Sequence, residues 1–388
     1  MKYYFVIANE KLNSGLLQSQ LIKPLEVYFK DQAILINLCR PFTTKYKSNN
    51  ITIINIPILI PFRFINYNIL CIFNDILCIL YAFFIFIRIF NIKRQKRIFV
   101  NRGYVPGLVG YWMKILFNNE FVFDPRSLYI YEHIGANNII KDSICYKYWK
   151  WLEKRVSRKS KNIVCVSKAM SDYFSNINYK CYDKNIRIPC IAEPVNSVLD
   201  LNNYLEIRNK YNYKESDIVV AYYGSLNYGW NNLLLYMNYF KKLNTLGYKI
   251  LILSQDASTL RNTELSYMEN LSIYGGDTRE AQSQALELLQ VADYGIILMK
   301  NSPDWETRLS VKFTQYTSFG IPVIVNKYVG EASRLIKKYD LNPSLIIDKS
   351  DSDIKLYKAP IEQKKHIRLW AKEYFNQKNI LKLKLNSK

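Results

Sequence analysis

The chain has 388 residues, of which 49% are hydrophobic and 22% are charged. This length exceeds what one compact core usually accommodates and suits two domains, and the ordinary balance of residue types excludes a disordered chain. The formal net charge of +22 predicts attraction to nucleic acid, anionic lipid or phosphorylated substrates. Because the sequence has no zinc-finger spacing and no aromatic RNA-binding signature, we expect no nucleic-acid partner and favour an anionic membrane surface.

Seven cysteines lie far apart in the sequence without any C-x-x-C pair. This spacing is typical of reduced, buried thiols in a cytosolic protein. The first residues, MKYYFVIANE, lack the charged and long apolar regions of a signal peptide and predict a first strand. We therefore expect the protein to work in the cytoplasm, peripheral to the inner face of the cell membrane.

Short strand-like runs alternate with helix-length amphipathic stretches along the first half of the chain. This alternation predicts a parallel sheet covered by helices on both faces. The runs are rich in Val, Ile, Phe and Tyr and most lead into polar or Gly/Pro-bearing turns. The predicted strands are Tyr3–Ala8, Ala33–Leu38, Ile51–Ile56, Arg97–Val100, Glu120–Phe123, Asn162–Val166 and Ile186–Pro189.

The same pattern restarts after residue 203. The sequence thus predicts two Rossmann-like α/β domains facing a central cleft, residues 1–195 and 196–360. A helical stretch within 361–388 is expected to cross back onto the first domain. The strands predicted for the second domain are Ile218–Tyr223, Lys249–Leu253, Leu271–Tyr274, Tyr294–Met299, Pro322–Asn326 and Ser344–Ile347.

The segment Ile69–Phe90 is unusually apolar, and its core ILCILYAFFIFI is followed by Arg88 and then by a basic cluster at Lys93, Arg94, Lys96 and Arg97. It falls between strands of one predicted sheet, so crossing a bilayer would disrupt the domain. Two interpretations remain: a buried core helix, or a helix lying in the membrane interface beside its basic cluster. The nearly uniform apolar character and the basic run favour the interface slightly.

A Gly-Ser turn, Gly224-Ser225, follows the first strand of the second predicted domain. Glycine lets the backbone approach a ligand closely, and the N-terminus of a following helix favours a phosphate. The alternative is a tight turn without a ligand.

A second candidate phosphate site comprises a polar loop and a short helix over Ser310–Val323. Arg308 and Lys312 lie near the predicted helix start, where cations can join the helix dipole in binding a diphosphate. Gln315 can donate to and accept from ribose hydroxyls. We therefore assign Gly224, Ser225, Arg308, Ser310, Lys312 and Gln315 to nucleotide-sugar binding, with a solvated surface loop as the alternative.

Four candidate catalytic residues follow a buried strand of the first predicted domain. Asp124 and Arg126 come directly after this strand and can project into the cleft. Arg126 can clamp a phosphate or carboxylate, and Glu132 can orient it or act as a base. His133 is beside Glu132 and is either structural or catalytic. A purely structural Asp124–Arg126 ion pair is the competing interpretation.

The sequence shows no metal-binding motif. It has two histidines, no D-x-D motif and only scattered carboxylates. No G-x-S-x-G nucleophile motif is present either, which argues against a hydrolase. We expect no metal and no cofactor, so that protein cations and backbone donors must neutralise a diphosphate.

The order of these motifs resembles glycosyltransferase family four, within the glycosyl transferases group one superfamily, and related GT-B enzymes of bacterial surface polysaccharide synthesis. The resemblance covers nearly the whole chain. Each motif is degenerate, and it is their ordered combination that is specific. The matching segments are Val100–Gly103, Phe123–Ser127 with Glu132, Val164–Met170, Ile188–Cys190, Tyr223–Leu226, Val291–Ile296 and Ser310–Val323.

The resemblance implies a retaining transferase that holds a nucleotide-diphosphate sugar in the second domain and the acceptor in the first. It places Gly15 and Arg102 on the acceptor side. The family usually carries two glutamates in the donor region, where this chain has Thr307 and Gln315. The usual cations after the Gly-Ser turn are absent from 227–232, which makes the donor site atypical.

The sequence therefore predicts a metal-independent glycosyltransferase acting on a glycan or lipid-linked acceptor in capsule, lipopolysaccharide or glycoprotein glycan assembly. A nucleotide-sugar 2-epimerase is one alternative, although that reaction calls for more titratable groups around one sugar carbon than two histidines suggest. A catalytically silent scaffold subunit of the same fold is the other alternative.

Overall fold

The computed structural model describes residues 3–10, 12, 14, 17–39, 48, 50–57, 69–90, 97–178, 184–191, 201–226, 233–276, 278–347 and 354–385. The chain forms two compact units: unit 1 comprises residues 1–191 and 377–388, and unit 2 comprises residues 192–376. This division lies close to the boundary expected at residue 195. The segment 361–388 is shared, because its helical first part belongs to unit 2 and its last residues belong to unit 1.

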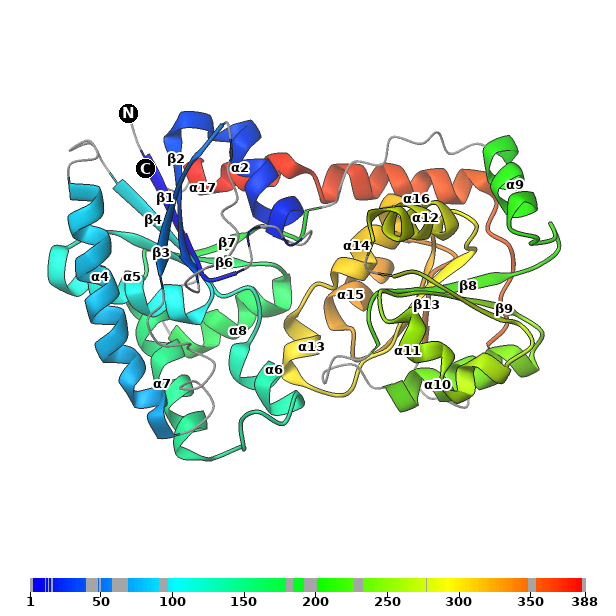
Figure 1. Cartoon of the computed structure of the whole chain (residues 1–388), viewed down its shortest axis with the longest axis horizontal. Coiled ribbons are helices and arrows are strands. Elements are labelled where there is room, and N and C mark those ends of the chain that lie inside the picture. Colours follow the sequence, from blue (N-terminus) through cyan, green and yellow to red (C-terminus); the bar gives the residue numbers. More distant parts are fainter. Residues whose placement is uncertain are drawn as a thin grey trace. The chain divides into compact units, whose positions relative to one another are not determined.

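Unit 1 contains a parallel sheet in the order β3-β2-β1-β4-β5-β6-β7 (Figure 1). The strand order reverses at β1 and β4, so the carboxyl ends of these two strands form the switch point where ligands bind in open α/β sheets. The strands are β1 (Tyr3–Ala8), β2 (Ala33–Cys39), β3 (Thr52–Pro57), β4 (Arg97–Arg102), β5 (Phe121–Asp124), β6 (Asn162–Cys165) and β7 (Asn185–Arg187).

Helices cover both faces of this sheet, as expected for parallel strands joined by crossovers. Two glycines of α5 bring it close to the strands, because a Cβ at Gly107 would meet the Phe123 ring at 2.7 Å and one at Gly110 would meet Asn101 at 2.6 Å. The main helices are α2 (Lys23–Tyr28), α4 (Asn74–Phe90), α5 (Tyr104–Phe117), α6 (Tyr129–Gly135), α7 (Ile144–Lys159), α8 (Lys168–Asn178) and α17 (Lys382–Leu385).

Unit 2 contains a second parallel sheet, in the order β10-β9-β8-β11-β12-β13. Its switch point is formed by the carboxyl ends of β8 and β11. The strands are β8 (Val219–Tyr223), β9 (Lys249–Leu253), β10 (Leu271–Tyr274), β11 (Tyr294–Ile297), β12 (Val323–Asn326) and β13 (Leu345–Ile347). The α/β prediction and the strands predicted from residue patterns are confirmed, with ends that differ by at most a few residues.

The helices of unit 2 begin with α9 and end with α16, which the figure shows as a long orange helix (Figure 1). They are α9 (Leu201–Lys210), α10 (Leu233–Thr245), α11 (Ala257–Arg261), α12 (Arg279–Leu289), α13 (Pro303–Thr307), α14 (Val311–Ser318), α15 (Gly330–Tyr339) and α16 (Ile361–Tyr374).

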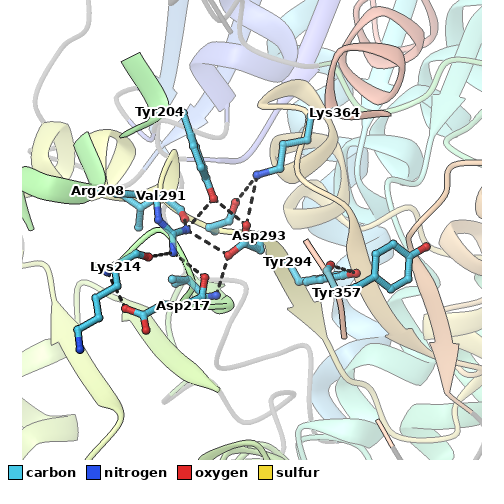
Figure 2. A network of polar contacts seen from close by, with 11 residues as sticks. Tyr204, Arg208, Lys214, Asp217, Val291, Asp293, Tyr294, Tyr357 and Lys364 are labelled. Carbon is cyan, nitrogen blue, oxygen red and sulfur yellow. Dashed lines mark hydrogen bonds and ion pairs between the residues drawn. The ribbon is translucent and has the colours of Figure 1, made fainter. Parts of the chain in front are cut away.

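A buried polar network joins α9 and α16 to the sheet of unit 2 (Figure 2). Its centre is Asp293, whose carboxylate pairs with Arg208 at 3.1 Å and with Lys364 at 3.6 Å. The same carboxylate accepts hydrogen bonds from Tyr204 Oη at 2.7 Å and from the Val219 backbone N–H at 2.8 Å. A single carboxylate thereby fixes two terminal helices of the unit to its first strand.

Candidate functional site

The strongest candidate site lies at the carboxyl edge of the unit 2 sheet. A pocket of about 220 Å³ is bordered there by the ends of β8, β9 and β10 and by α12. Pockets that enclose drug-sized ligands are larger, about 300–1,000 Å³, so this volume suits a part of a ligand, such as a nucleoside. The lining residues are Tyr223, Gly224, Ser225, Leu253, Ser254, Gln255, Gly275, Gly276, Ala281, Gln282 and Ala285.

Gly224 brings this pocket into contact with α14. Its φ of +129° is in a region that favours glycine, and a Cβ at this position would lie 2.8 Å from Lys312 Cε. The Lys312 ammonium lies 5.0 Å from the centre of the Tyr222 ring. The structure therefore brings together two residues that the sequence assigned separately to phosphate binding.

The packing of Tyr316 explains why α14 occupies this position. Tyr316 is one helical turn after Lys312, and its hydroxyl accepts a hydrogen bond from the Tyr223 backbone N–H at 2.8 Å. Its ring lies over Gly295 of β11, where a Cβ would approach the ring to 2.4 Å. The absence of a side chain at Gly295 thus lets Tyr316 hold the start of α14 over the end of β8.

Burial, together with the positive charge of the nearby Arg308, lowers the pKa of Lys312 to about 8. Among the described residues, no carboxylate lies within ion-pair distance of the Lys312 ammonium. The N-terminal turn of α14, with backbone N–H groups that have no partner within the helix, begins beside this ammonium. This combination of a desolvated cation and a helix N-terminus is suited to an anion.

The other residues assigned to donor binding have different surroundings. Arg308 pairs with Asp304 at 2.8 Å and lies over the Trp305 ring at 4.5 Å, so much of its charge is compensated. Ser225 donates its hydroxyl to Asp256. Ser310 precedes α14 and is buried, and Gln315 is partly buried one turn into this helix.

Thr307, which the family resemblance places where a glutamate is usual, donates its hydroxyl to the Pro303 carbonyl at 2.9 Å. This side chain thus interacts with its own helix. The backbone of 227–232, where the family cations are missing, lies outside the described residues.

A second group of charged residues gathers at the switch point of unit 1. Arg102 ends β4 and is only 2% exposed, with Nε 2.6 Å from Glu10 Oε1 and Nη1 3.5 Å from Asp124 Oδ2. The family resemblance placed Arg102 on the acceptor side, and in the structure this buried guanidinium holds the two carboxylates in place. Burial raises the pKa of Glu10, but the stronger combined effect of Arg102 and Arg126 holds it below its ordinary value.

Arg126 and Asp124 lie together at the end of β5, with Arg126 Nη1 3.9 Å from Asp124 Oδ1. Arg126 has a φ of +64° and is partly exposed, whereas Asp124 is buried. Arg126 is therefore the cation that this group presents to solvent.

Glu132 and His133 are neighbours on α6 but have different partners. Glu132 accepts a hydrogen bond from Ser127 Oγ at 2.6 Å, and His133 Nδ1 lies 3.1 Å from Asn138 Nδ2. The His133 ring also lies 4.2 Å from the Tyr129 ring. Gly15, the remaining acceptor-side residue, lies outside the described residues.

Sequence patterns did not single out Glu10, which belongs to the charged group at the switch point of unit 1. The only signal available for it was its position just after the first strand, where parallel sheets place functional side chains. Within the described part of the chain, no three or more His, Cys, Asp or Glu side chains come together in a way that could hold a metal ion.

The sequence matches no protein-family model, and a search of curated proteins finds no significant relative. Solved structures, by contrast, match along the whole chain. The structure of Anabaena HepE in complex with UDP-glucose has a TM-score of 0.64 at 11% identity, covering 100% of this chain and 99% of that one. WaaG, a glycosyltransferase involved in lipopolysaccharide biosynthesis, has a TM-score of 0.60 at 12% identity, covering 99% and 98%.

A third match is the N-terminal domain of Candida albicans trehalose-6-phosphate phosphatase, with a TM-score of 0.66 at 11% identity and coverage of 100% and 97%. These likenesses confirm the predicted fold: the chain has the two-unit α/β architecture of GT-B glycosyltransferases. At such low identity they define the fold, and the activity must be argued from the sites of this chain.

Proposed function

We propose that the chain is a glycosyltransferase that binds a nucleotide-diphosphate sugar at the carboxyl edge of the unit 2 sheet. The observation that carries this proposal is the contact of Lys312 with Gly224 at the rim of the 220 Å³ pocket. The pocket takes the nucleoside, and Lys312 with the N-terminus of α14 binds the diphosphate. HepE, which shares the fold, is described in complex with UDP-glucose.

We further propose that the transfer is metal-independent. The leaving diphosphate needs positive charge, which Lys312 and the α14 N-terminus can supply, with a smaller contribution from Arg308 because Asp304 compensates much of its charge. Retention of configuration is proposed from the family resemblance. Gln315 would then take the place of the family glutamate as the ribose contact.

The acceptor side of the reaction is assigned to unit 1. Arg126 is positioned to bind an anionic group, and Asp124, Glu132 and His133 are the nearby titratable side chains. An acidic or phosphate-bearing acceptor suits this set, in keeping with a lipid-linked or glycan acceptor of surface polysaccharide or glycoconjugate synthesis. Such an acceptor would be used at the cytoplasmic side of the membrane.

The first test is thermal stabilisation by uridine, guanosine, adenosine and cytidine diphosphates. A ligand at 100 times its Kd stabilises the folded state by about 2.7 kcal/mol. We expect one diphosphate to raise the melting temperature, and the corresponding nucleotide sugar to be turned over in the presence of EDTA. Stabilisation without turnover on any acceptor would favour the silent scaffold, and no stabilisation by any of the four would refute the donor site.

A further inference from the structure

The structure assigns a membrane-docking surface to unit 1, formed by the outer face of α4 with the adjoining ends of α5 and α7. This inference deepens the membrane-side working position proposed above, and it does not depend on the donor site. It rests on the exposure, spacing and charge of described side chains.

The outward face of α4 and of the turn before it is apolar. Leu80 is 58% exposed and Ile87 is 68% exposed, and the other members recur at the three- and four-residue spacing of one helix face. A soluble protein rarely exposes such a contiguous row without a partner. The row consists of Ile72, Phe73, Ile76, Leu80, Phe83, Phe84 and Ile87.

The opposite face of α4 is part of the core of unit 1. Cys78, Ala82 and Ile85 are fully buried, and the Phe86 ring stacks on Phe117 of α5 with centroids 3.9 Å apart. One face of the helix is therefore a core face, and the other is exposed, as the proposed interfacial position requires. Lys93, Arg94 and Lys96 of the predicted basic cluster lie outside the described residues.

One helical segment among the described residues, Cys71–Ile89, is long and apolar enough to cross a membrane, with a mean hydropathy of 2.1 and 33% of its residues buried. Its inner contacts argue against crossing. Asp75 pairs with Arg155 at 3.1 Å and accepts a hydrogen bond from Trp112 at 2.9 Å. Spanning would break these contacts and leave a carboxylate in hydrocarbon, whereas lying in the interface retains them.

Trp151 extends the surface onto α7. It is 51% exposed, and the Arg155 guanidinium lies 4.4 Å from its ring and 3.1 Å from Asp75 at the start of α4. Tryptophan is enriched where apolar and aqueous phases meet. Ile115 and Leu116 at the end of α5 are also exposed.

On α4, α5 and α7, the charged residues that border this face are cations. Each carboxylate on these three helices is paired with a cation. Arg88 is exposed and lies over the Phe84 ring at 5.4 Å, and α7 exposes Lys147, Lys154 and Arg158. The acidic residues of α4, α5 and α7 are Asp75, paired with Arg155, and Glu153, buried and paired with Lys150 at 3.0 Å. An apolar row beside uncompensated cations is complementary to a bilayer with anionic headgroups.

Flotation with vesicles of phosphatidylcholine, with or without phosphatidylglycerol, tests the docking surface. We expect the full-length protein to float with the anionic vesicles and to be released by high salt. The double variant Leu80→Gln/Ile87→Gln should bind these vesicles at least tenfold more weakly, and Lys147→Gln/Lys154→Gln should lose about fivefold per cation removed.

The matched control is Leu234→Gln/Leu369→Gln, two leucines of unit 2 that are as exposed as those of α4 and lie outside the surface. It should float like the unchanged protein. Equal flotation with neutral and anionic vesicles, retention at high salt until detergent is added, or full binding by the Leu80/Ile87 variant would each overturn the proposal. So would a dimer in lipid-free solution that this variant dissociates, because a second copy would then cover the face.

Nucleotide-induced thermal stabilisation, measured on the same variants, separates this proposal from the proposed function. The docking variants should keep the stabilisation of the unchanged protein, which also shows that they fold. Loss of flotation with retained stabilisation supports the docking surface alone. Flotation without stabilisation by any diphosphate would leave the docking surface standing and refute the donor site.

Discussion

Lys312 Cε occupies the space next to Gly224 that a side chain at position 224 would need, at 2.8 Å from an ideal Cβ. The contact joins the first strand of unit 2 to a helix that begins almost ninety residues later in the sequence. It places an ammonium group beside the turn at which the family resemblance lacks its usual cations. In the proposed donor site, positive charge would then come from a different element of the fold.

Replacing Lys312 by Gln should weaken nucleoside diphosphate binding about 10- to 100-fold, because a hydrogen bond to a charged group contributes about 1.5–3 kcal/mol. The apo protein should keep its melting temperature, since Lys312 is partly desolvated and has no carboxylate partner among the described residues. Lys337→Gln, at an exposed lysine of α15, is the control and should bind normally. Calorimetric titration of both variants measures the difference.

Binding should also depend on pH through Lys312. Its pKa in the free protein is about 8, so the ammonium loses its proton as the pH rises from 7 to 9 and affinity for a diphosphate falls. A bound anion favours the charged form and raises this pKa, so binding near pH 8 should take up a proton. Titrations in buffers of different ionisation enthalpy detect that uptake. It should disappear in Lys312→Gln, and its persistence there would assign the proton to another group.

Arg126→Gln should lower turnover about 10- to 100-fold if the guanidinium binds the acceptor, by the same estimate for a charged hydrogen bond. Donor binding should be unchanged, because Arg126 belongs to unit 1. The partly exposed side chain makes only a long ion pair, 3.9 Å to Asp124, so the fold should tolerate its removal. Lys161→Gln, at a partly exposed ion pair on the same unit, serves as the control. Full turnover by Arg126→Gln would remove this residue from the site.

Asp293→Asn should destabilise unit 2 by about 3–5 kcal/mol, because Arg208 and Lys364 would remain buried without their counter-charge (Figure 2). For a unit of this size that corresponds to a fall of roughly 10 °C in the melting temperature, measured by scanning calorimetry. Glu287→Gln removes a solvent-exposed partner of Lys210 on the same unit and should change little. Similar effects of the two substitutions would contradict the role given to the buried network.

Residue patterns predicted the strands because strand periodicity and Gly/Pro punctuation are local properties. They also gave Gly224, Lys312, Asp124 and Arg126 as separate candidates, from positions that follow strands or begin helices. The contact between Gly224 and Lys312 could not be predicted, because it depends on Tyr316 packing over Gly295.

Arg102 shows most clearly what residue patterns alone cannot predict. The family resemblance placed it on the acceptor side, but residue patterns gave no sign of its burial or of its ion pairs with Glu10 and Asp124. Likewise, the sequence of Ile69–Phe90 could not separate a core helix from an interfacial one. Apolar residues occupy nearly all faces of this helix, so the sequence pattern does not distinguish a buried face. The structure shows which face packs against α5.

The measurement that tests the central claim most directly is calorimetric titration of the full-length protein with uridine, guanosine, adenosine and cytidine diphosphates, repeated with Lys312→Gln. We expect one of them to bind with a stoichiometry near one per chain, and we expect the substitution to weaken this binding at least tenfold. Binding of none of the four, or equal binding by the protein with and without Lys312, would contradict it.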